Sequence, residues 1–393
     1  MPLFLGIDIG TSATKAVLCD EVGVVVAAAS SPHTISRPHP GWSEQDPQIW
    51  FDAAIAAIQQ VLATDKVHPE TIAAVGLSGQ MHGSVFLPPD ATAHDGSKAA
   101  AIRPALLWND QRTSEQCIQI EQAAGGRAQL VQLVGNAALT GFTLPKILWL
   151  RDHEPENFAK TASVILPKDY IRLRLTGRIA TDFGDAAGTL LLDIQKRIWS
   201  QEAIAMARID QDLLPPLLES STVAGSITQW AASQTGLKAG TPVVTGSGDN
   251  QAGAVGAGVV SPGRVLATLG TSGVIYAHAS KPQLDISNDT PPGRVHTMCA
   301  PTGSENGPGQ WCITGCMLAA AGSLQWLRDT LFPSASFDEL VAQAATAPPG
   351  SDGLVFLPHL TGERCPYPDP NARAGWIGLT SRHTRAHMIR SVL

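Results

Sequence analysis

Residues 4–18, FLGIDIGTSATKAVL, place a turn rich in glycine and threonine between two apolar runs. The turn lacks the Gly-Lys-Ser/Thr ending of a Walker A loop and the three-glycine spacing of a dinucleotide-binding loop. The runs LFLGIDIG, KAVLCD and GVVVAAAS predict three short strands separated by turns. The chain is therefore predicted to open with a β-meander whose first turn carries Gly10, Thr11 and Lys15.

A second stretch, LGTSGVIYA at 269–277, repeats the pattern of IGTSATKAV at 9–17. Each predicts a strand, a Gly-Thr-Ser turn and a second strand, although a repeat this short also arises by coincidence. Two turns rich in backbone N–H and hydroxyl donors are suited to holding an anion between them. We therefore expect two related domains, 1–245 and 246–393, each with one such turn.

Composition narrows the class of protein. The 393 residues suffice for two domains, and 44% hydrophobic residues indicate a folded globular protein. The net charge of −7 is spread without a basic run, so neither nucleic acid nor an anionic membrane is an expected partner. With no signal-peptide pattern and no apolar run of membrane-spanning length, we expect a soluble, cytoplasmic protein. The sequence leaves homodimer formation open.

The six cysteines show no disulfide spacing typical of a small secreted domain, so we expect reduced thiols. Cys312 and Cys316 could face each other across one helical turn, but no second Cys/His pair lies nearby to complete a metal site. A structural role for these cysteines is therefore favoured.

The middle of the chain predicts further helices and strands. PQIWFDAAIAAIQQVLAT at 47–64 predicts a helix, and IAAVGLSGQMHGSVFL returns to strand character. Further helices are expected at 111–124, 145–152 and 198–208, and the last residues predict one more. The whole chain is therefore predicted to be mixed α/β.

The segment GSGDNQAGAVGAG at 246–258 places Asp249 between an apolar strand and an Ala/Gly-rich helix. One interpretation is that Asp249 caps that helix. The other is that its carboxylate accepts the proton of an alcohol that attacks phosphorus.

Phosphoryl transfer also requires groups that hold the phosphates and a carboxylate that positions Mg²⁺. Asp8 beside the first turn could hold the metal through water, or it could simply pair with Lys15. Thr11 and Lys15 could contact one phosphate end, and Gly270 and Thr271 the other. Hairpin geometry alone is the alternative for the glycines.

These segments together resemble the FGGY family of carbohydrate kinases along the whole chain. GIDIGTS is similar to the family's first phosphate turn, LATLGTSG to its second, and GSGDN to its catalytic-aspartate segment. GFTLPKILWLRDH at 141–153 fits the first family signature, and 374–393 fits most of the second. Subfamily character comes from SRPHPGWSEQDP, GQMHG, LLWNDQR and LPKDYIRLRLTG.

The resemblance implies an actin-like, ribonuclease H-like pair of α/β domains that close over ATP and a sugar. It implies Asp249 as general base, Asp8 for Mg²⁺ and activity, and Met81, His82 and Asn250 as sugar contacts. D-xylulose or a similar ketopentose is the expected substrate. The chain stops just inside the second signature, so an incomplete second domain and weakened ATP binding are also expected.

Three alternatives stay open beside these assignments. The protein could be a kinase with the same chemistry and another acceptor, such as ribulose, gluconate or glycerol. It could be a non-catalytic sugar-binding protein that keeps the kinase fold. It could also be an actin-like ATPase, which would share the two phosphate turns. His82 could be packed and hydrogen-bonded rather than functional. Trp42, Glu44 and Asp46 either close over the sugar or cap the helix near Pro47. Lys146 is expected to anchor a helix rather than to touch phosphate.

Overall fold

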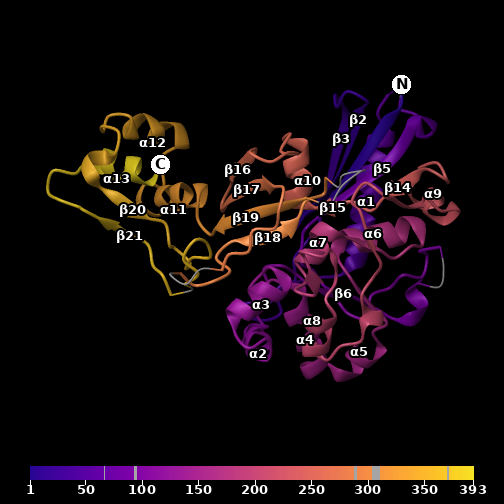
Figure 1. The fold of residues 1–393 in the computed structure, drawn as a ribbon. Helices are drawn as coiled ribbons and strands as arrows, with labels where there is room; N and C mark the ends of the chain where they lie inside the picture. Colours follow the sequence, from indigo (N-terminus) through magenta and orange to yellow (C-terminus); the bar gives the residue numbers. More distant parts are fainter. Residues whose placement is uncertain (66, 93–94, 287–289, 303–309, 370) are drawn as a thin grey trace. The chain divides into compact units, whose positions relative to one another are not determined.

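The computed structural model describes residues 1–65, 67–92, 95–286, 290–302, 310–369 and 371–393. The chain divides into two compact units. The first comprises Met1–Pro262, His278–Gly293 and Thr297–Cys312; the second comprises Gly263–Ala277, Arg294–His296 and Ile313–Leu393. The boundary that the sequence suggests near residue 245 stays a prediction. Both units contain helices and strands (Figure 1).

A seven-stranded sheet forms the centre of the first unit, with the order β13-β14-β5-β1-β2-β3 and with β15 paired to β5. The antiparallel pairs β1–β2 and β2–β3 confirm the predicted meander. In contrast, β5 runs parallel to β1, and β14 and β15 run parallel to β5. The strands are β1 (Leu3–Ile9), β2 (Ala13–Asp20), β3 (Val25–Pro32), β5 (Ile72–Gly79), β13 (Val223–Ser226), β14 (Pro242–Val244) and β15 (Ser247–Gly248).

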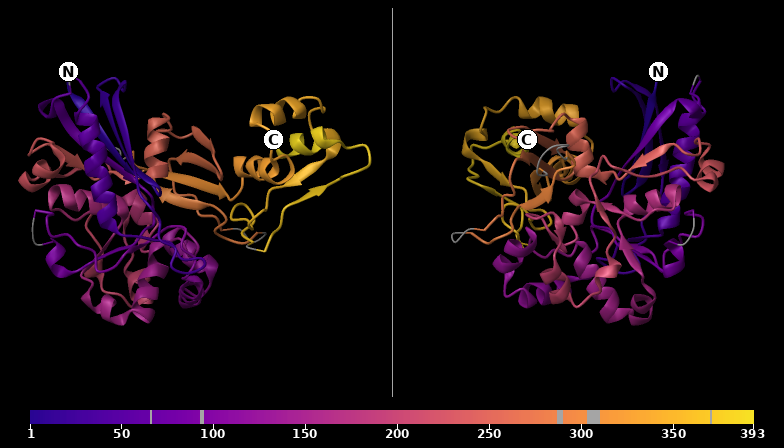
Figure 2. Two further views of the ribbon diagram at one scale, coloured as in Figure 1. Left: turned by 180° about the vertical axis from the view of Figure 1, so that it is seen from behind. Right: turned by 45° about the vertical axis from the view of Figure 1, so that its right-hand side comes forward.

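The two faces of β1 explain how the sheet is covered. Successive strand residues point to opposite faces, so Leu5, Ile7 and Ile9 are buried on one face while Gly6 and Asp8 lie on the other. The predicted helix at 47–64 is confirmed as α1 (Pro47–Leu62), which packs against β2 and β3. In both views of Figure 2 these indigo strands lie side by side.

The first unit contains further helices and short strands outside this sheet. The predicted helices at 111–124, 145–152 and 198–208 are confirmed as α2, α4 and α8, although α8 starts only at Gln201 because Ile198 and Trp199 form a short strand. These elements are β4 (Glu44–Gln45), η1 (Pro69–Thr71), β6 (Val85–Leu87), η2 (Pro89–Thr92), β7 (Ala105–Leu106), α2 (Ser114–Ala123), α3 (Arg127–Val134), α4 (Thr143–His153), α5 (Pro155–Lys160), β8 (Ser163–Ile165), α6 (Pro167–Thr176), β9 (Thr181–Asp182), α7 (Phe183–Ala187), β10 (Leu192–Asp193), β11 (Ile198–Trp199), α8 (Gln201–Ala207), η3 (Gln211–Leu213), β12 (Leu217–Leu218), α9 (Gln229–Thr235) and α10 (Asp249–Gly256).

The second unit contains the repeated Gly-Thr-Ser turn. β16 (Val265–Leu269) pairs antiparallel with β17 (Gly273–Ala279), which confirms the predicted strand–turn–strand arrangement. β16 and β17 belong to a four-stranded sheet with the order β16-β17-β19-β18, with β18 at His296–Cys299 and β19 at Trp311–Met317; the residues of this sheet are divided between the two units. Cys312 and Cys316 lie on strand β19, so the idea that one helical turn separates them is wrong. Four residues of strand span about 13 Å, too far for two thiols to share a metal.

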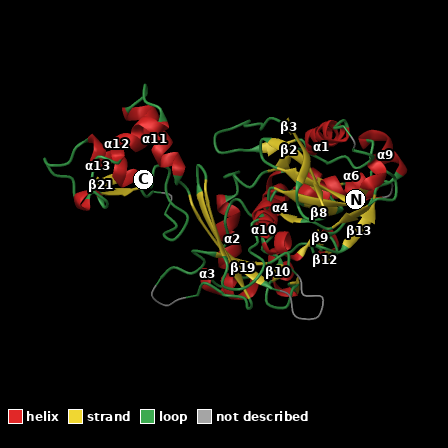
Figure 3. Cartoon of the chain, turned by 90° about the horizontal axis from the view of Figure 1, so that it is seen from above, coloured by secondary structure: helices red, strands yellow, loops and turns green. Residues whose placement is uncertain are grey.

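Three helices gather around the last short strands of the second unit (Figure 3). Their small apolar core contains Leu327, Leu340 and Ile389. The predicted terminal helix is confirmed as α13. The elements are α11 (Ala321–Leu331), α12 (Phe337–Ala344), η4 (Ser351–Gly353), β20 (Val355–Leu357), β21 (Gly375–Ile377) and α13 (Arg385–Val392). In the described part of the chain, no helix is long and apolar enough to cross a membrane.

Candidate active site

Three parallel strands bring the predicted catalytic residues of the first unit to one edge of the sheet. Asp8 of β1 pairs in register with Ser78 of β5, and Gly248 of β15 pairs with Gly79 of β5. Because β1, β5 and β15 run in the same direction, their carboxyl ends meet at this edge. The GQMHG segment follows β5 and Asp249 follows β15, so both segments start beside Asp8.

Asp249 is the first residue of α10, and the N-cap position belongs to Gly248. The interpretation of Asp249 as the helix cap is therefore wrong. Its Oδ1 atom accepts a hydrogen bond from the backbone N–H of Asn250 at 2.7 Å. Burial, followed by the negative charge of Asp8, raises the pKa of Asp249 to about 6 against the opposing effect of that hydrogen bond. Asp249 is thus a stronger proton acceptor than an ordinary aspartate, yet mostly ionised at neutral pH.

Two glycines allow the segment before Asp249 to approach its neighbours. Gly246 has a φ of +82°, and a Cβ atom there would lie 2.3 Å from the carbonyl oxygen of Leu77. A Cβ atom on Gly248 would lie 2.6 Å from Cγ of Met81. The Nδ2 atom of Asn250 lies 3.8 Å from Sδ of Met81. Two predicted sugar contacts, Met81 and Asn250, are therefore neighbours.

His82 has a left-handed backbone, with a φ of +66°, which is uncommon for a residue other than glycine. Its carbonyl oxygen accepts hydrogen bonds from Oγ1 of Thr143 at 3.2 Å and Nζ of Lys146 at 2.9 Å. Its ring Nδ1 lies 3.2 Å from the carbonyl oxygen of Gly188, and the ring packs against Phe142. The structure thus packs this side chain as the structural alternative predicts, and its contact with sugar stays a prediction.

Lys146 is buried in α4 and acts as an anchor, as the sequence predicts. Besides the carbonyl of His82, its Nζ atom donates to the carbonyl oxygen of Gly141 at 2.6 Å. Burial lowers the pKa of Lys146 to about 7. This side chain therefore ties the strained residue of GQMHG to α4 rather than binding phosphate through its own charge.

The first turn closes with a hydrogen bond from the Gly10 N–H to the carbonyl oxygen of Ala13, 3.0 Å long. Asp8 accepts a hydrogen bond from Oγ of Ser78 at 3.0 Å. Lys15 faces Asp8 across the strand pair, but no ion pair joins the two among the described residues, so the idea of a structural Asp8–Lys15 pair is wrong. Sequence reasoning missed Ser78; its position directly before GQMHG was the available signal.

A cavity of about 780 Å³ within the first unit reaches this edge of the sheet. Its lining includes Asp8, Lys15 and Ser78, together with Gly246 and Ser247 from the segment before Asp249. The volume lies in the range of small-molecule sites in proteins.

The second turn, in the second unit, closes with a hydrogen bond that spans one residue fewer than that of the first turn. The Gly270 N–H donates to the carbonyl oxygen of Ser272 at 3.0 Å. The carbonyl oxygens of Gly270 and Thr271 accept from the N–H groups of Ala321 and Ala320, at 3.0 and 2.9 Å. The start of α11 therefore fixes this turn, and the proposed phosphate contacts of Gly270 and Thr271 remain predictions.

Two different roles are found within the group of Trp42, Glu44 and Asp46: capping of α1 and contact with Arg112. Asp46 is the N-cap of α1 and accepts from the N–H of Gln48 at 2.9 Å, so the capping alternative holds for this residue. Glu44 forms an ion pair with Arg112 at 2.7 Å, and the guanidinium carbon of Arg112 lies 3.6 Å from the ring centroid of Trp42. Trp42 and Glu44 thus hold Arg112 in place.

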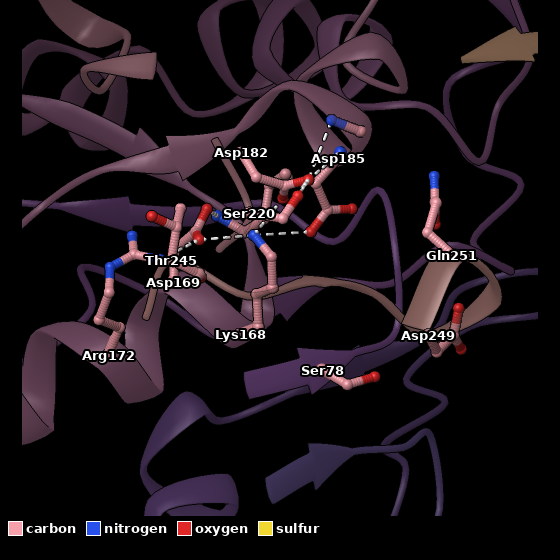
Figure 4. A network of polar contacts seen from close by, with 12 residues as sticks. Ser78, Lys168, Asp169, Arg172, Asp182, Asp185, Ser220, Thr245, Asp249 and Gln251 are labelled. Atoms are coloured by element: carbon pink, nitrogen blue, oxygen red, sulfur yellow. Dashed lines mark hydrogen bonds and ion pairs between the residues drawn. The ribbon is translucent and has the colours of Figure 1, made fainter. Parts of the chain in front are cut away.

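A second acidic group, which we call the Lys168 network, lies buried near the same edge (Figure 4). The Nζ atom of Lys168 lies 2.7, 2.8 and 3.1 Å from carboxylate oxygens of Asp169, Asp182 and Asp185. Arg172 adds a second cation, 2.9 Å from Asp169. All five side chains are fully buried.

The Lys168 network combines two cations with three acidic groups. Burial lowers the pKa of Lys168, but the three acidic groups outweigh burial and raise it overall. Burial raises the pKa of Asp185 to about 8, so this carboxyl group holds a proton more strongly than an ordinary aspartate does. Lys168 and Arg172 therefore offset much of the negative charge of this network.

The Lys168 network also supports the segment that carries Asp249. Nη1 of Arg172 donates to the carbonyl oxygen of Thr245 at 2.8 Å, four residues before Asp249. Cβ of Lys168 lies 3.4 Å from where a Cβ of Gly79 would stand, directly under the end of β5. Sequence reasoning missed these residues, because the LPKDYIRLRLTG segment shows the charges but not their burial.

Asp8 and Asp249, which we call the carboxylate pair, have no such cation. Among the described residues, no Lys or Arg forms an ion pair with either of them. Mg²⁺ in phosphoryl-transfer sites is held by one or two carboxylates together with phosphate and water oxygens. The oxygen donors and unbalanced charge of the carboxylate pair therefore fit Mg²⁺.

Two family models together match most of the chain. The model of the FGGY family of carbohydrate kinases, N-terminal domain, matches residues 3–256, and the C-terminal domain model matches 265–393. The chain is 39% identical to the xylulose kinase of Bacillus subtilis over 393 residues, which cover 100% of this chain and 75% of that protein.

Solved structures show the same fold. A xyloylose kinase from Brucella ovis superposes with a TM-score of 0.87 at 36% identity, over 99% of this chain and 76% of that one. A gluconate kinase from Lactobacillus acidophilus superposes with a TM-score of 0.88 at 29% identity, over 100% of this chain and 75% of that one.

Proposed function

Since the chain belongs to the FGGY family of carbohydrate kinases, we propose that it transfers the γ-phosphoryl group of ATP to D-xylulose, giving D-xylulose 5-phosphate and ADP. The fold is the two-domain, actin-like fold of that family, and the protein is a carbohydrate kinase. The choice of D-xylulose rests on relatives described as xylulose kinases. The observation that supports the chemistry is the carboxylate pair beside Met81 and Asn250 at one sheet edge.

In the proposed reaction the terminal hydroxyl oxygen of the sugar forms a bond to the γ-phosphorus. The bond from that phosphorus to the bridging oxygen of ADP breaks, and Oδ of Asp249 takes the hydroxyl proton. A pKa of about 6 suits this task, because the carboxylate is ionised at neutral pH yet accepts a proton more readily than an ordinary aspartate.

The remaining residues bind and orient. Mg²⁺ held near Asp8 would neutralise charge on the phosphate oxygens. Thr11 and Lys15 in the first unit, and Gly270 and Thr271 in the second, are proposed to contact phosphate oxygens. Met81, His82 and Asn250 are proposed to contact the sugar, since Asn250 hydrogen-bonds Asp249 and lies next to Met81, and His82 follows Met81 in the chain.

A panel of acceptors tests the substrate. ADP release is measured with D-xylulose, D-ribulose, D-gluconate and glycerol at equal concentrations. The proposal predicts the highest kcat/KM with D-xylulose. D-gluconate is the rival to include, because the Lactobacillus acidophilus gluconate kinase matches the fold as well as a xylulose kinase does. A higher kcat/KM with any other acceptor would contradict the choice of D-xylulose.

A further inference from the structure

Thr11 in the first turn is held at both of its oxygen atoms by side chains from elsewhere in the chain. Nε1 of Trp108 donates to Oγ1 of Thr11 at 3.0 Å. Nε2 of Gln45 donates to the carbonyl oxygen of Thr11 at 2.8 Å. Gln45 belongs to β4 and Trp108 lies two residues after β7, which pairs with β4. One small two-stranded sheet therefore delivers both donors to the turn.

The hydrogen bond from Trp108 fixes which way the hydroxyl hydrogen of Thr11 can point. An indole nitrogen only donates, so the Thr11 oxygen must be the acceptor in this contact. A threonine hydroxyl has one hydrogen, which is then directed away from the indole and toward another acceptor. Phosphate oxygens only accept, so they match the direction in which this hydroxyl donates.

The amide of Gln45 has only one consistent orientation. Its Oε1 atom accepts from Nε1 of Trp50 at 2.9 Å, and an indole nitrogen cannot be an acceptor. Its Nε2 atom therefore faces the carbonyl oxygens of Thr11 and Thr34, which cannot donate. Gln45 is only 2% exposed, so water does not compete for these bonds. The position of the Thr11 carbonyl is thus firmly set.

The same Gln45 amide also contacts the sugar-binding segment. Its Oε1 atom accepts a second hydrogen bond, from Nε2 of Gln80 at 3.1 Å. Gln80 directly precedes Met81 and is 1% exposed. One buried amide therefore joins the backbone of the first turn to the residue beside the predicted sugar contacts.

We propose that Trp108 and Gln45 are positioning residues that aim the Thr11 hydroxyl at a phosphate oxygen of the nucleotide, with Gln45 keeping the turn in register with GQMHG. This inference rests on the proposed kinase function. It assigns a task to Trp108 that does not require the indole to touch either substrate. The most conservative substitution of Trp108 for a test is Trp108→Phe, which keeps an aromatic ring and removes the N–H donor.

A double-mutant cycle tests the inference. The variants are Trp108→Phe, Thr11→Val and the two combined, with Thr11→Ser as the control that keeps the hydroxyl. Losing one hydrogen bond of this kind should lower kcat/KM for ATP by about tenfold in Trp108→Phe. Thr11→Val should lower kcat/KM at least as much, and the double variant should match Thr11→Val within about twofold, because both changes remove one interaction. KM for the sugar should stay within about twofold of the parent in Trp108→Phe.

Two results would overturn the inference: single-variant effects that multiply in the double variant, or a Trp108→Phe effect confined to KM for the sugar. The cycle is run with whichever acceptor the parent phosphorylates, so the test still works if D-xylulose is not the substrate. If no acceptor is phosphorylated, the proposed function is wrong. The same four proteins are then compared by their affinity for MgATP, measured by calorimetry. Circular dichroism checks folding, and Trp108→Tyr serves as a second variant without the indole N–H.

Discussion

Two acidic groups near the same sheet edge of the first unit differ in how their charge is balanced. In the Lys168 network, Asp169, Asp182 and Asp185 surround one lysine in the fully buried interior. In the carboxylate pair, neither Asp8 nor Asp249 forms an ion pair with Lys or Arg among the described residues. Figure 4 draws Asp249 apart from the dashed lines that converge on Lys168.

The difference separates a structural group from a candidate catalytic one. A buried charge is tolerated when an opposite charge and hydrogen bonds satisfy it, as in the Lys168 network. An unbalanced pair destabilises the free protein, and only a bound cation or a proton relieves it. The carboxylate pair is therefore the group that fits a metal ion and a proton-transfer step.

Lys168→Met should have the largest effect on stability. Without Nζ, three buried carboxyl groups lose their shared partner, and removing one member of a buried ion pair costs about 3–5 kcal/mol. Urea unfolding followed by circular dichroism measures the change. Lys15→Met is the matched control: Lys15 is exposed, so its loss should change the free energy of unfolding by less than about 0.5 kcal/mol. Equal losses in the two variants would contradict the division.

The paired variants Asp249→Asn and Asp182→Asn should shift stability in opposite directions. Folding raises the pKa of Asp249 from 3.8 to about 6, so the native state binds more protons between these values and loses stability as pH rises through that window. Removing the charge should therefore stabilise the protein at pH 7 by about 1–3 kcal/mol. Asp182→Asn should destabilise it, because Asp182 holds Lys168 and accepts hydrogen bonds from Gly184 and Ser220.

Unfolding curves at pH 4.5 and pH 7 check the sign. The gain from Asp249→Asn should shrink at pH 4.5, where the parent carboxyl is already largely protonated in the folded state. A gain that is larger at pH 4.5 would contradict the raised pKa of Asp249.

The acid limb of the pH–rate profile tests the interaction within the carboxylate pair. With Asp249 as base, kcat/KM should fall about tenfold per pH unit below a pKa of about 6. Asp8→Asn removes a negative charge that raises this pKa, so the limb should move to lower pH while overall activity falls. A limb that stays in place would show that Asp8 does not influence the titrating group.

A second buried lysine, Lys146, extends the comparison and should give a smaller effect. Lys146 has carbonyl oxygens as partners, those of His82 and Gly141, instead of carboxylates. Lys146→Met leaves both oxygens without this donor and should destabilise the protein by about 1–3 kcal/mol, less than Lys168→Met. It should also raise KM for the sugar, because His82 loses one of its two carbonyl anchors. Thr143→Val, which removes the other anchor, should have the weaker effect on KM.

Local sequence patterns predicted the framework of the site. The alternating residues of β1, the Pro-initiated α1 and the two Gly-Thr-Ser turns carry signals within a few residues of each other. The position of Asp249 after a strand followed from the same kind of pattern. These elements depend on turn chemistry and hydrophobic periodicity, which a single sequence displays.

The interactions between distant segments could not be predicted in the same way. The charged residues of α6 resemble an exposed helix, yet all ten residues of that helix are buried because carboxylates of β9 and α7 reach them. The contact between Trp108 and Thr11 likewise joins residues 97 positions apart. The prediction from the spacing of Cys312 and Cys316 was wrong for a related reason. Their four-residue spacing also fits a helical turn, but the segment pairs with other strands as β19.

The most direct test of the account replaces Asp249 by alanine and measures kcat for sugar phosphorylation by ADP release, with Asp46→Asn as a control because asparagine caps α1 as well as aspartate does. The account predicts that kcat falls by about 10²–10⁴-fold in Asp249→Ala. Its unfolding curve should stay cooperative, and Asp46→Asn should keep nearly the parent's kcat. A folded Asp249→Ala protein whose kcat lies within about threefold of the parent would contradict the role of Asp249 as the general base.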